Sequence, residues 1–288
     1  MFDPSGKLRF SDTTLRDGEQ APGVVFSLAD KLRIAAALDG FGVDEAEVGS
    51  SALGPEELAG LRVLAGQGYA MRLSCWCRAM EEDIYYAAKA GLRRVNVSFP
   101  VSDILLGSMD RCRDWVLHHL DGVLPFAARA CESFSVGLQD AGRADPAFLE
   151  RVVRVIADSG ASHVRVSDTV GVLNPFTTAA LVGRVRQAAP ALGVSFHAHN
   201  DLGMAVANAL AAAQAGAGTL DCTVNDVLMA TVAAALGSHL RSRDFGTDGL
   251  VLRASVPMNL RAAEEPMTLG NKFGLVFVDL PVGVRNPL

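Results

Sequence analysis

The stretch SFHAHND, residues 195–201, ends an apolar run and stands directly before an alanine-rich segment. In a β-strand, residues two apart point to the same side, so His197 and His199 can face one point in space. Two such imidazoles need only one carboxylate to complete a metal site with positions open for substrate. Asp17 offers that carboxylate, although two histidines that simply end a strand would give the same short motif.

The alternation of a short apolar run with a longer helical pattern recurs along the chain. The predicted strands are residues 8–15, 43–49, 70–76, 94–99, 134–138, 163–167, 194–199 and 220–224. Eight strands separated by helices predict an α/β fold, the (β/α)8 TIM barrel. A doubly wound open sheet is the competitor, because a linear sequence does not show closure. We assign residues 1–242 to the barrel and residues 243–288 to a C-terminal tail that packs on the barrel or on a partner subunit.

Helix starts and stops support this alternation. Ser27, with Asp30 three residues later, has the pattern of a capping box. Asp145 and Asn174 are capping residues that each precede a proline at the first helical position. Glycines at positions 40, 66, 91, 160 and 216 fall where helices should end.

Composition excludes several classes of protein. The chain has 288 residues, of which 50% are hydrophobic and 20% charged, and a formal charge of −6, which argues against a nucleic-acid binder. The first residues lack the apolar core of a signal peptide, and the longest apolar stretch, 205–220, is interrupted by polar residues. The five cysteines lack paired spacing, so we expect a cytoplasmic protein that spans no membrane. Cys75 and Cys77 alternate along one face of a predicted strand, which would let them line the interior, and we expect all five cysteines to act as small hydrophobic residues.

Polar residues fall at the ends of the predicted strands, where a barrel carries its chemistry. Arg16 and Asp17 follow the first strand, Gln139 the fifth and Thr169 the sixth. Two imidazoles and a carboxylate suit zinc, manganese, iron or cobalt, and magnesium if water and substrate supply further ligands. Such an ion would polarise the ketone of a 2-oxo acid for attack by a carbon nucleophile.

Arg16 and Thr169 are candidate substrate contacts. Arg16 always carries charge and could stabilise an oxyanion, or it could form an ion pair with Asp12 or Glu19 instead. Thr169 offers a hydroxyl and a backbone N–H to a substrate carboxylate, or makes a simple turn hydrogen bond.

Three motifs resemble those of the DRE-TIM metallolyase superfamily: residues 12–20 (DTTLRDGEQ), 167–171 (SDTVG) and 197–208 (HAHNDLGMAVAN). Residues 76–78 and 100–103 are similar to those of homocitrate synthases, particularly the nitrogen-fixation type, a subgroup related to the isopropylmalate synthases. The resemblance covers about residues 8–225 and implies a TIM barrel, a divalent metal (Mg, Mn or Zn) and a homodimer. The family's synthases condense an acyl-CoA with a 2-oxo acid and hydrolyse the thioester.

The resemblance also implies residue roles. The metal ligands would be Asp17, His197 and His199. Arg16 would stabilise the enolate or alkoxide oxygen, while Gln20 and Thr169 would contact the 2-oxo acid. Gln139 is the candidate catalytic position after the fifth strand, where the synthases carry a glutamate; glutamine cannot donate and recover a proton.

Two further departures leave the reaction open. Residues 226–232 replace the family's glycine-rich loop after the eighth strand, and the chain ends at Leu288 with no histidine in residues 272–279. A lyase that cleaves a hydroxy acid or its CoA thioester, like hydroxymethylglutaryl-CoA lyase, is therefore the alternative. A degenerate barrel that binds metal without turnover is the third reading.

Overall fold

The computed structural model describes residues 8–21, 24–222, 236–248, 250–259 and 273–280. The chain divides into two compact units, residues 1–19 with 26–222 and residues 20–25 with 223–288. Our assignment of residues 1–242 to the barrel and 243–288 to a tail remains a prediction.

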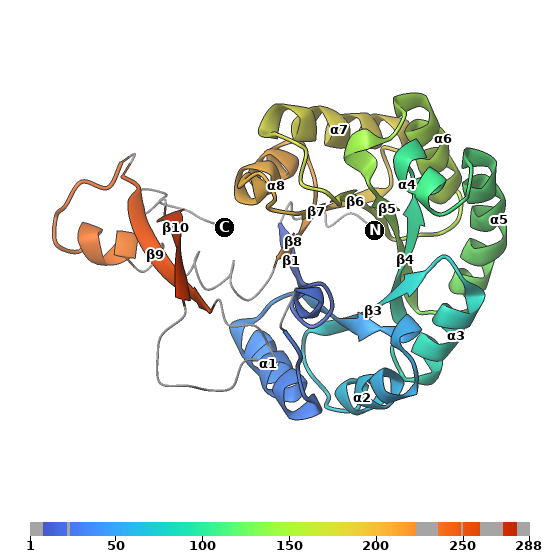
Figure 1. Cartoon of the computed structure of the whole chain (residues 1–288), viewed down its shortest axis with the longest axis horizontal. Coiled ribbons are helices and arrows are strands. Elements are labelled where there is room, and N and C mark those ends of the chain that lie inside the picture. Colours follow the sequence, from blue (N-terminus) through green and yellow to red (C-terminus); the bar gives the residue numbers. More distant parts are fainter. Residues whose placement is uncertain (1–7, 22–23, 223–235, 249, 260–272, 281–288) are drawn as a thin grey trace. The chain divides into compact units, whose positions relative to one another are not determined.

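The first unit is a closed barrel of parallel strands, so the predicted fold class is confirmed (Figure 1). Each strand pairs with the next in chain order, and β8 pairs with β1 in the register Arg9–Thr219 to Asp12–Cys222. The strands are β1 (Arg9–Asp12), β2 (Glu45–Ser50), β3 (Arg72–Arg78), β4 (Arg94–Pro100), β5 (Ser133–Gln139), β6 (His163–Asp168), β7 (Gly193–Ala198) and β8 (Thr219–Cys222).

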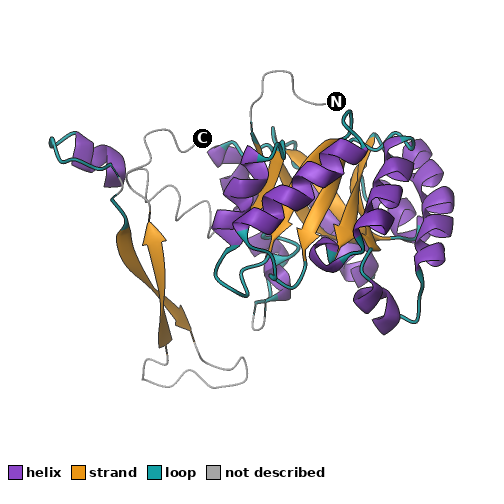
Figure 2. Ribbon diagram, turned by 90° about the horizontal axis from the view of Figure 1, so that it is seen from above, coloured by secondary structure: helices purple, strands orange, loops and turns teal. Residues whose placement is uncertain are grey.

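Helices surround this barrel, as Figure 2 shows from the side. They are α1 (Leu28–Phe41), α2 (Pro55–Ala65), α3 (Glu81–Lys89), α4 (Asp103–Ser108), α5 (Arg113–Ala130), α6 (Pro146–Ala157), α7 (Pro175–Ala188) and α8 (Ala205–Gln214). Helix α6 shows why they pack inward, because its apolar residues recur every three or four positions. Leu149, Val152, Val153 and Ile156 are each no more than 1% exposed.

The predicted helix starts are confirmed, and one predicted stop is wrong. Ser27 and Asp30 form the capping box of α1, while Asp145 and Asn174 cap α6 and α7 through their side chains. Helix α1 continues through Gly40 and ends at Gly42, whose φ of 80° lies in the left-handed region that favours glycine. Gly42 ends helix α1 because a residue with a left-handed backbone follows the last helical turn and does not lie within it.

Polar residues line the interior of the barrel. Buried polar side chains recur at alternate positions of the strands, among them Ser11, Glu47, Ser74, Asn96, Ser135, Arg165 and Ser195. Cys75 and Cys77 alternate with Ser74 and Trp76, and Cys77 Sγ lies 3.4 Å from Ser51 Oγ in the turn after β2. Both cysteines are fully buried on the outer face of β3, so the interior position suggested by their alternation is wrong.

In the second unit, β9 (Leu252–Asn259) and β10 (Phe273–Leu280) form an antiparallel pair, which the sequence reading did not predict. The predicted helix start at residues 226–232 lies outside the described residues. No helix in the part of the chain given above combines the length and the apolar character needed to cross a bilayer.

Candidate metal centre

A tight turn after β1 projects Arg16 and Asp17. The strand ends at Asp12, whose carboxylate accepts hydrogen bonds from the backbone N–H and the hydroxyl of Thr14. The carbonyl of Thr13 then accepts the N–H groups of Arg16, Asp17 and Gly18 at 2.8–3.2 Å. The strand predicted to run to residue 15 is shorter, because the Asp12 side chain turns the backbone away from the sheet.

The two histidines lie at the carboxyl end of β7. His197 is within the strand and 6% exposed, and His199 follows it with its side chain 35% exposed. Their Nε2 atoms are 3.1 Å apart, and Oδ2 of Asp17 lies 3.6 Å from that of His197 and 3.8 Å from that of His199. Three lone-pair atoms from opposite ends of the sequence therefore converge on one point.

These separations suit a divalent ion. Bonds of about 2.1 Å place two ligand atoms about 3.0 Å apart at right angles and about 3.4 Å apart in a tetrahedron. Asp17, His197 and His199 are the cluster of potential ligands found in the described part of the chain, with all ligand atoms within 4.8 Å of one another. Two imidazole nitrogens facing each other at 3.1 Å repel unless a cation or a proton lies between them. The donor set thus forms a candidate site for one ion.

A ring of buried charges supports the site from inside the barrel. Asp221 on β8 lies with Oδ2 3.0 Å from Nδ1 of His197 and 2.8 Å from Nε of Arg165. Arg165 on β6 donates to Glu47 on β2 at 2.6 Å, and Glu47 in turn accepts Nε of Arg16.

The ring closes through Arg16. Its Nη1 lies 2.9 Å from Oδ1 of Asp17, which leaves Oδ2 of that aspartate for the ion. A carboxylate at Nδ1 of His197 selects the tautomer whose Nε2 is free to bind metal.

Burial and charge oppose each other in this ring. Burial alone would raise the pKa of Glu47, but Arg16 and Arg165 outweigh it and hold that pKa below its ordinary value. The pKa of Asp221 is lowered in the same way, since Arg165 and His197 overcome the effect of burial. Burial, followed by the neighbouring His197, lowers the pKa of His199. His199 is therefore neutral near pH 7, the form that binds metal.

Gln139 and Thr169 lie at the ends of β5 and β6, as predicted. Asp140, next to Gln139, has a left-handed φ of 59° and is held by Ser102 and Arg143. Its backbone N–H donates to Oγ1 of Thr169 at 2.8 Å. This bond joins two loops 29 residues apart in the sequence and does not close a turn, and the hydroxyl keeps its own hydrogen for a ligand.

The other predicted residues are placed as follows. Arg16 does not pair with Asp12 or Glu19; Glu19 lies 2.8 Å from the buried ammonium of Lys31 instead. The side-chain amide of Gln139 makes no hydrogen bond to any residue that the structure describes. Gln20 ends the short 3-10 turn Gly18–Gln20 and belongs to the second unit, so its predicted contact with substrate remains a prediction.

Glu47, Arg165 and Asp221 were not among the residues predicted from the sequence. Each is a charged residue inside a strand whose neighbours are apolar, and such residues are rarely buried unless paired. That signal was readable in the sequence, but it does not say which charges pair across the barrel.

Comparison with known proteins agrees with this geometry. Residues 7–235 match the HMGL-like family. Over 271 residues the chain is 38% identical to the homocitrate synthase of Frankia alni, covering 91% of this chain and 77% of that one. Homocitrate synthase 1 of Nostoc sp. is 43% identical over 221 residues, which cover 76% of this chain and 58% of the relative. The chain thus spans little more than half the length of some curated relatives that it matches.

Among solved structures, the hydroxymethylglutaryl-CoA lyase from Pseudomonas aeruginosa superposes with a TM-score of 0.65 at 25% identity, covering 76% of this chain and 77% of that one. The sequence match, the closed barrel and the position of the candidate ligands at the ends of β1 and β7 lead to one conclusion. The chain belongs to the HMGL-like family, within the DRE-TIM metallolyase superfamily.

Proposed function

We propose that the protein is a metal-dependent condensing enzyme, homocitrate-synthase-like, which joins the acyl group of an acyl-CoA to the ketone carbon of a 2-oxo acid. The observation that carries the proposal is the convergence of Asp17, His197 and His199 beside Arg16, in a chain whose relatives include homocitrate synthases. The described site is within one barrel unit and lies at the carboxyl ends of the strands, where barrels of this kind react.

Asp17, His197 and His199 would hold the ion, and their donor set admits magnesium, manganese or zinc. When bound, the ion supplies a Lewis acid for the ketone of the 2-oxo acid. The rest of the chemistry belongs to the side chains of the chain.

Arg16 stabilises the oxyanion that develops on the substrate. Its Nε and Nη1 are held by Glu47 and Asp17, which fixes the plane of the guanidinium and leaves Nη2 for a substrate oxygen. The ring of Trp76 lies 5.9 Å from the guanidinium carbon and limits its movement. A preorganised donor of this kind lowers the barrier because it does not reorganise during the reaction.

Thr169 orients the 2-oxo acid. Since Thr169 Oγ1 already accepts from Asp140, its hydrogen points to an acceptor such as the substrate carboxylate. Gln139 contributes a neutral amide and cannot move a proton. Proton transfer near the reacting carbonyl therefore needs another group, and a carboxylate at position 139 should improve turnover.

A cleaving reaction is the second candidate, supported by the likeness to hydroxymethylglutaryl-CoA lyase. Both reactions would use the same metal site and the same arginine, in opposite directions. A barrel that binds metal without turnover is the third.

One set of assays separates these functions. Purified protein with Mn²⁺ or Mg²⁺ is given acetyl-CoA with each of a panel of 2-oxo acids, and release of free thiol is followed. Release that depends on one oxo acid and stops with chelator is the result we expect. Pyruvate or acetyl-CoA formed from a hydroxy acid or its thioester would show the lyase. No product from either set, with metal still bound, would show a barrel without catalysis.

The proposal includes a cytoplasmic location and a homodimer. The first is supported by the cysteines, all five of which are free thiols. The second rests on the family resemblance and is tested by the mass of the protein in solution.

A further inference from the structure

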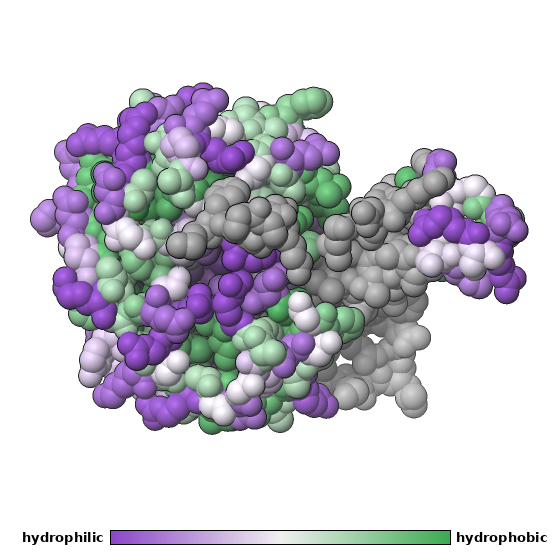
Figure 3. All heavy atoms as spheres, turned by 180° about the vertical axis from the view of Figure 1, so that it is seen from behind, coloured by the Kyte–Doolittle hydropathy of each residue, from purple (hydrophilic) through white to green (hydrophobic). Residues whose placement is uncertain are grey.

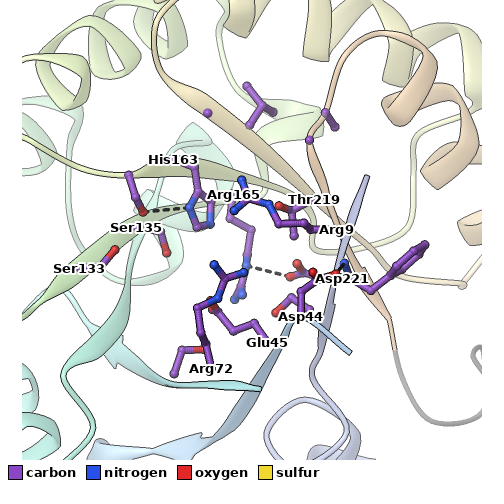
Figure 4. Close-up of a pocket in the computed structure, with 18 of the residues that line it drawn as sticks. Arg9, Asp44, Glu45, Arg72, Ser133, Ser135, His163, Arg165, Thr219 and Asp221 are labelled. Atoms are coloured by element: carbon purple, nitrogen blue, oxygen red, sulfur yellow. Dashed lines mark hydrogen bonds and ion pairs between the residues drawn. The ribbon is translucent and has the colours of Figure 1, made fainter. Parts of the chain in front are cut away.

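A cavity of about 450 Å³ opens at the other end of the barrel, among the amino-terminal ends of the strands. Figure 4 shows that its lining side chains come from the first residues of several strands, with Arg165 and Asp221 among them. Hydrophilic residues gather in the middle of this face of the barrel (Figure 3). The volume is typical of a site for a small molecule.

Arg9 is the cation of this cavity for which the described part of the chain supplies no ionic partner. The guanidinium groups of Arg72 and Arg94, also in the lining, lie 3.6 Å from Glu45 and 2.9 Å from Glu132. Arg9 forms no ion pair with any described residue, and its Nε is shielded from solvent without a hydrogen-bond partner. A partly buried guanidinium without an anion is costly, so its position favours a negatively charged ligand.

Two hydroxyl groups of the lining are also available to donate, one on the strand of Arg9 and one on β5, across the barrel from it. Ser11 lies on the same face of β1, is 3% exposed, and its Oγ has no partner in the described structure. Ser135 Oγ accepts the side-chain amide of Asn96 at 2.7 Å, so its own hydrogen is available. Both serines line the cavity with Arg9. The donors of β1 and β5 therefore face a common space.

The two strands that flank β1 present acceptors: Asp221 on β8 and Glu45 on β2 are both in register with Ser11. Oδ1 of Asp221 is buried without a hydrogen-bond partner, while Oδ2 is held by Arg165 and His197. Glu45 also lines the cavity, and burial raises the pKa of its carboxyl. Carboxylates suit the hydroxyl groups of a ligand and repel a second negative charge.

We propose that this cavity is a binding site for a small hydroxylated anion, a carboxylate or a phosphate. Its charge pairs with Arg9, and its hydroxyl groups donate to Asp221 and Glu45. The cavity lies at the other end of the barrel from the candidate metal centre, and the two sites share the supporting side chains Arg165 and Asp221.

Titration calorimetry on metal-free protein, kept in chelator, tests the site with two probes. Glycerol 3-phosphate and glycerate share the hydroxyl groups and differ in the anion. At least one of them is expected to bind saturably, with one molecule per chain. The ratio of the two dissociation constants shows which anion is preferred.

Matched variants locate the binding. Arg9→Gln should weaken it at least tenfold, and Ser11→Ala, which removes an unsatisfied hydroxyl and leaves the fold intact, should weaken it severalfold. Arg93 is exposed and lies outside the cavity, next in sequence to Arg94. The Arg93→Gln variant removes the same charge and should bind the probe as tightly as wild type. Asp17→Asn, altered only at the metal centre, should also bind as wild type.

The proposal is wrong if neither probe binds saturably, or if Arg9→Gln and Ser11→Ala both bind like wild type. Loss of binding in Asp17→Asn would place the anion at the metal centre and equally overturn it. Failure of the proposed condensation would leave these outcomes unchanged, because no metal is present.

Discussion

Asp221 orients the imidazole of His197 through Nδ1, so that the other ring nitrogen, Nε2, faces the candidate metal centre. The Oδ2–Nδ1 distance is 3.0 Å, and the Asp221 side chain is 2% exposed. Partners of this kind beyond the ligands fix the tautomer and raise the basicity of the imidazole. A residue without direct contact to the ion should therefore control how tightly it binds.

Asp221→Asn should weaken Mn²⁺ binding by about 10–100-fold, because the amide no longer favours the Nδ1–H tautomer. Titration calorimetry measures the affinity. Asp121→Asn makes the same charge change at an exposed position on α5, away from the ligands, and is the control. Equal affinities for the two variants would show that Asp221 does not position His197.

Gln139 stands at the position where the resemblance to the condensing enzymes implies a glutamate. Gln139→Glu should increase thiol release from acetyl-CoA and the preferred 2-oxo acid by tenfold or more, because a positioned proton carrier contributes about 10²–10⁴-fold. Gln139→Ala is the control and should show no gain. A glutamate variant no faster than wild type would mean that proton transfer at this position does not limit turnover.

At the level of elements, the loop after β6 packs tightly against the loop that follows His199. Gly171 has a φ of 58°, and a Cβ there would lie 2.5 Å from Oδ2 of Asp201 and 2.9 Å from its backbone nitrogen. A side chain at position 171 must therefore move the loop that holds the ligand His199.

Gly171→Ala should weaken Mn²⁺ binding severalfold, because it displaces that loop. Gly203→Ala is a matched control, since Gly203 also has a positive φ (72°) but open space around it. Both variants have backbone strain of about 1 kcal/mol, but only Gly171→Ala brings a Cβ against Asp201. Comparing their Mn²⁺ affinities by calorimetry therefore separates the effect of this contact from the effect of strain. Similar affinities for both would contradict a role for the contact with Asp201.

The strands and helix caps could be predicted because their signals are local. Ser27, Asp145 and Asn174 cap helices through residues two or three positions away, so the sequence around each contains the whole signal. The ring of charges could not be predicted in the same way. Arg165 and Glu47 are 118 residues apart, and only the curvature and closure of the barrel bring them together. Similarly, the candidate ligands were found from motifs, but the pairing of Arg16 with Glu47 needed the structure.

At the level of the whole molecule, buried polar and charged side chains connect the two ends of the barrel. His163 lies at the amino-terminal end, where burial, followed by the nearby Arg165, lowers its pKa to about 4. In the unfolded chain this histidine has an ordinary pKa. Between about pH 6.5 and 4 it is therefore protonated in the unfolded chain and neutral in the folded barrel. The stabilisation by neutral His163 is therefore fully present above pH 6.5 and is lost as the pH falls toward 4.

The free energy of unfolding of the barrel should thus fall between pH 7 and pH 5 by up to about 2 kcal/mol from this residue, since each pKa unit corresponds to ~1.4 kcal/mol. Water in the cavity can solvate the charged imidazole and so makes the decrease in the free energy of unfolding smaller. Urea unfolding followed by circular dichroism at both pH values measures it, and His163→Gln should have a smaller pH dependence. An unchanged dependence in the variant would mean that His163 is not the group responsible.

The central claim is that Asp17, His197 and His199 bind one divalent ion at the carboxyl end of the barrel. The most direct test is titration of chelator-treated protein with Mn²⁺, comparing wild type with Asp17→Asn while circular dichroism confirms the fold. The wild-type chain should bind one ion, and the variant should bind it more than about 100-fold more weakly, a larger loss than that of a partner outside the ligand shell. A folded variant with wild-type affinity, or a wild-type chain that binds no ion, would contradict the claim.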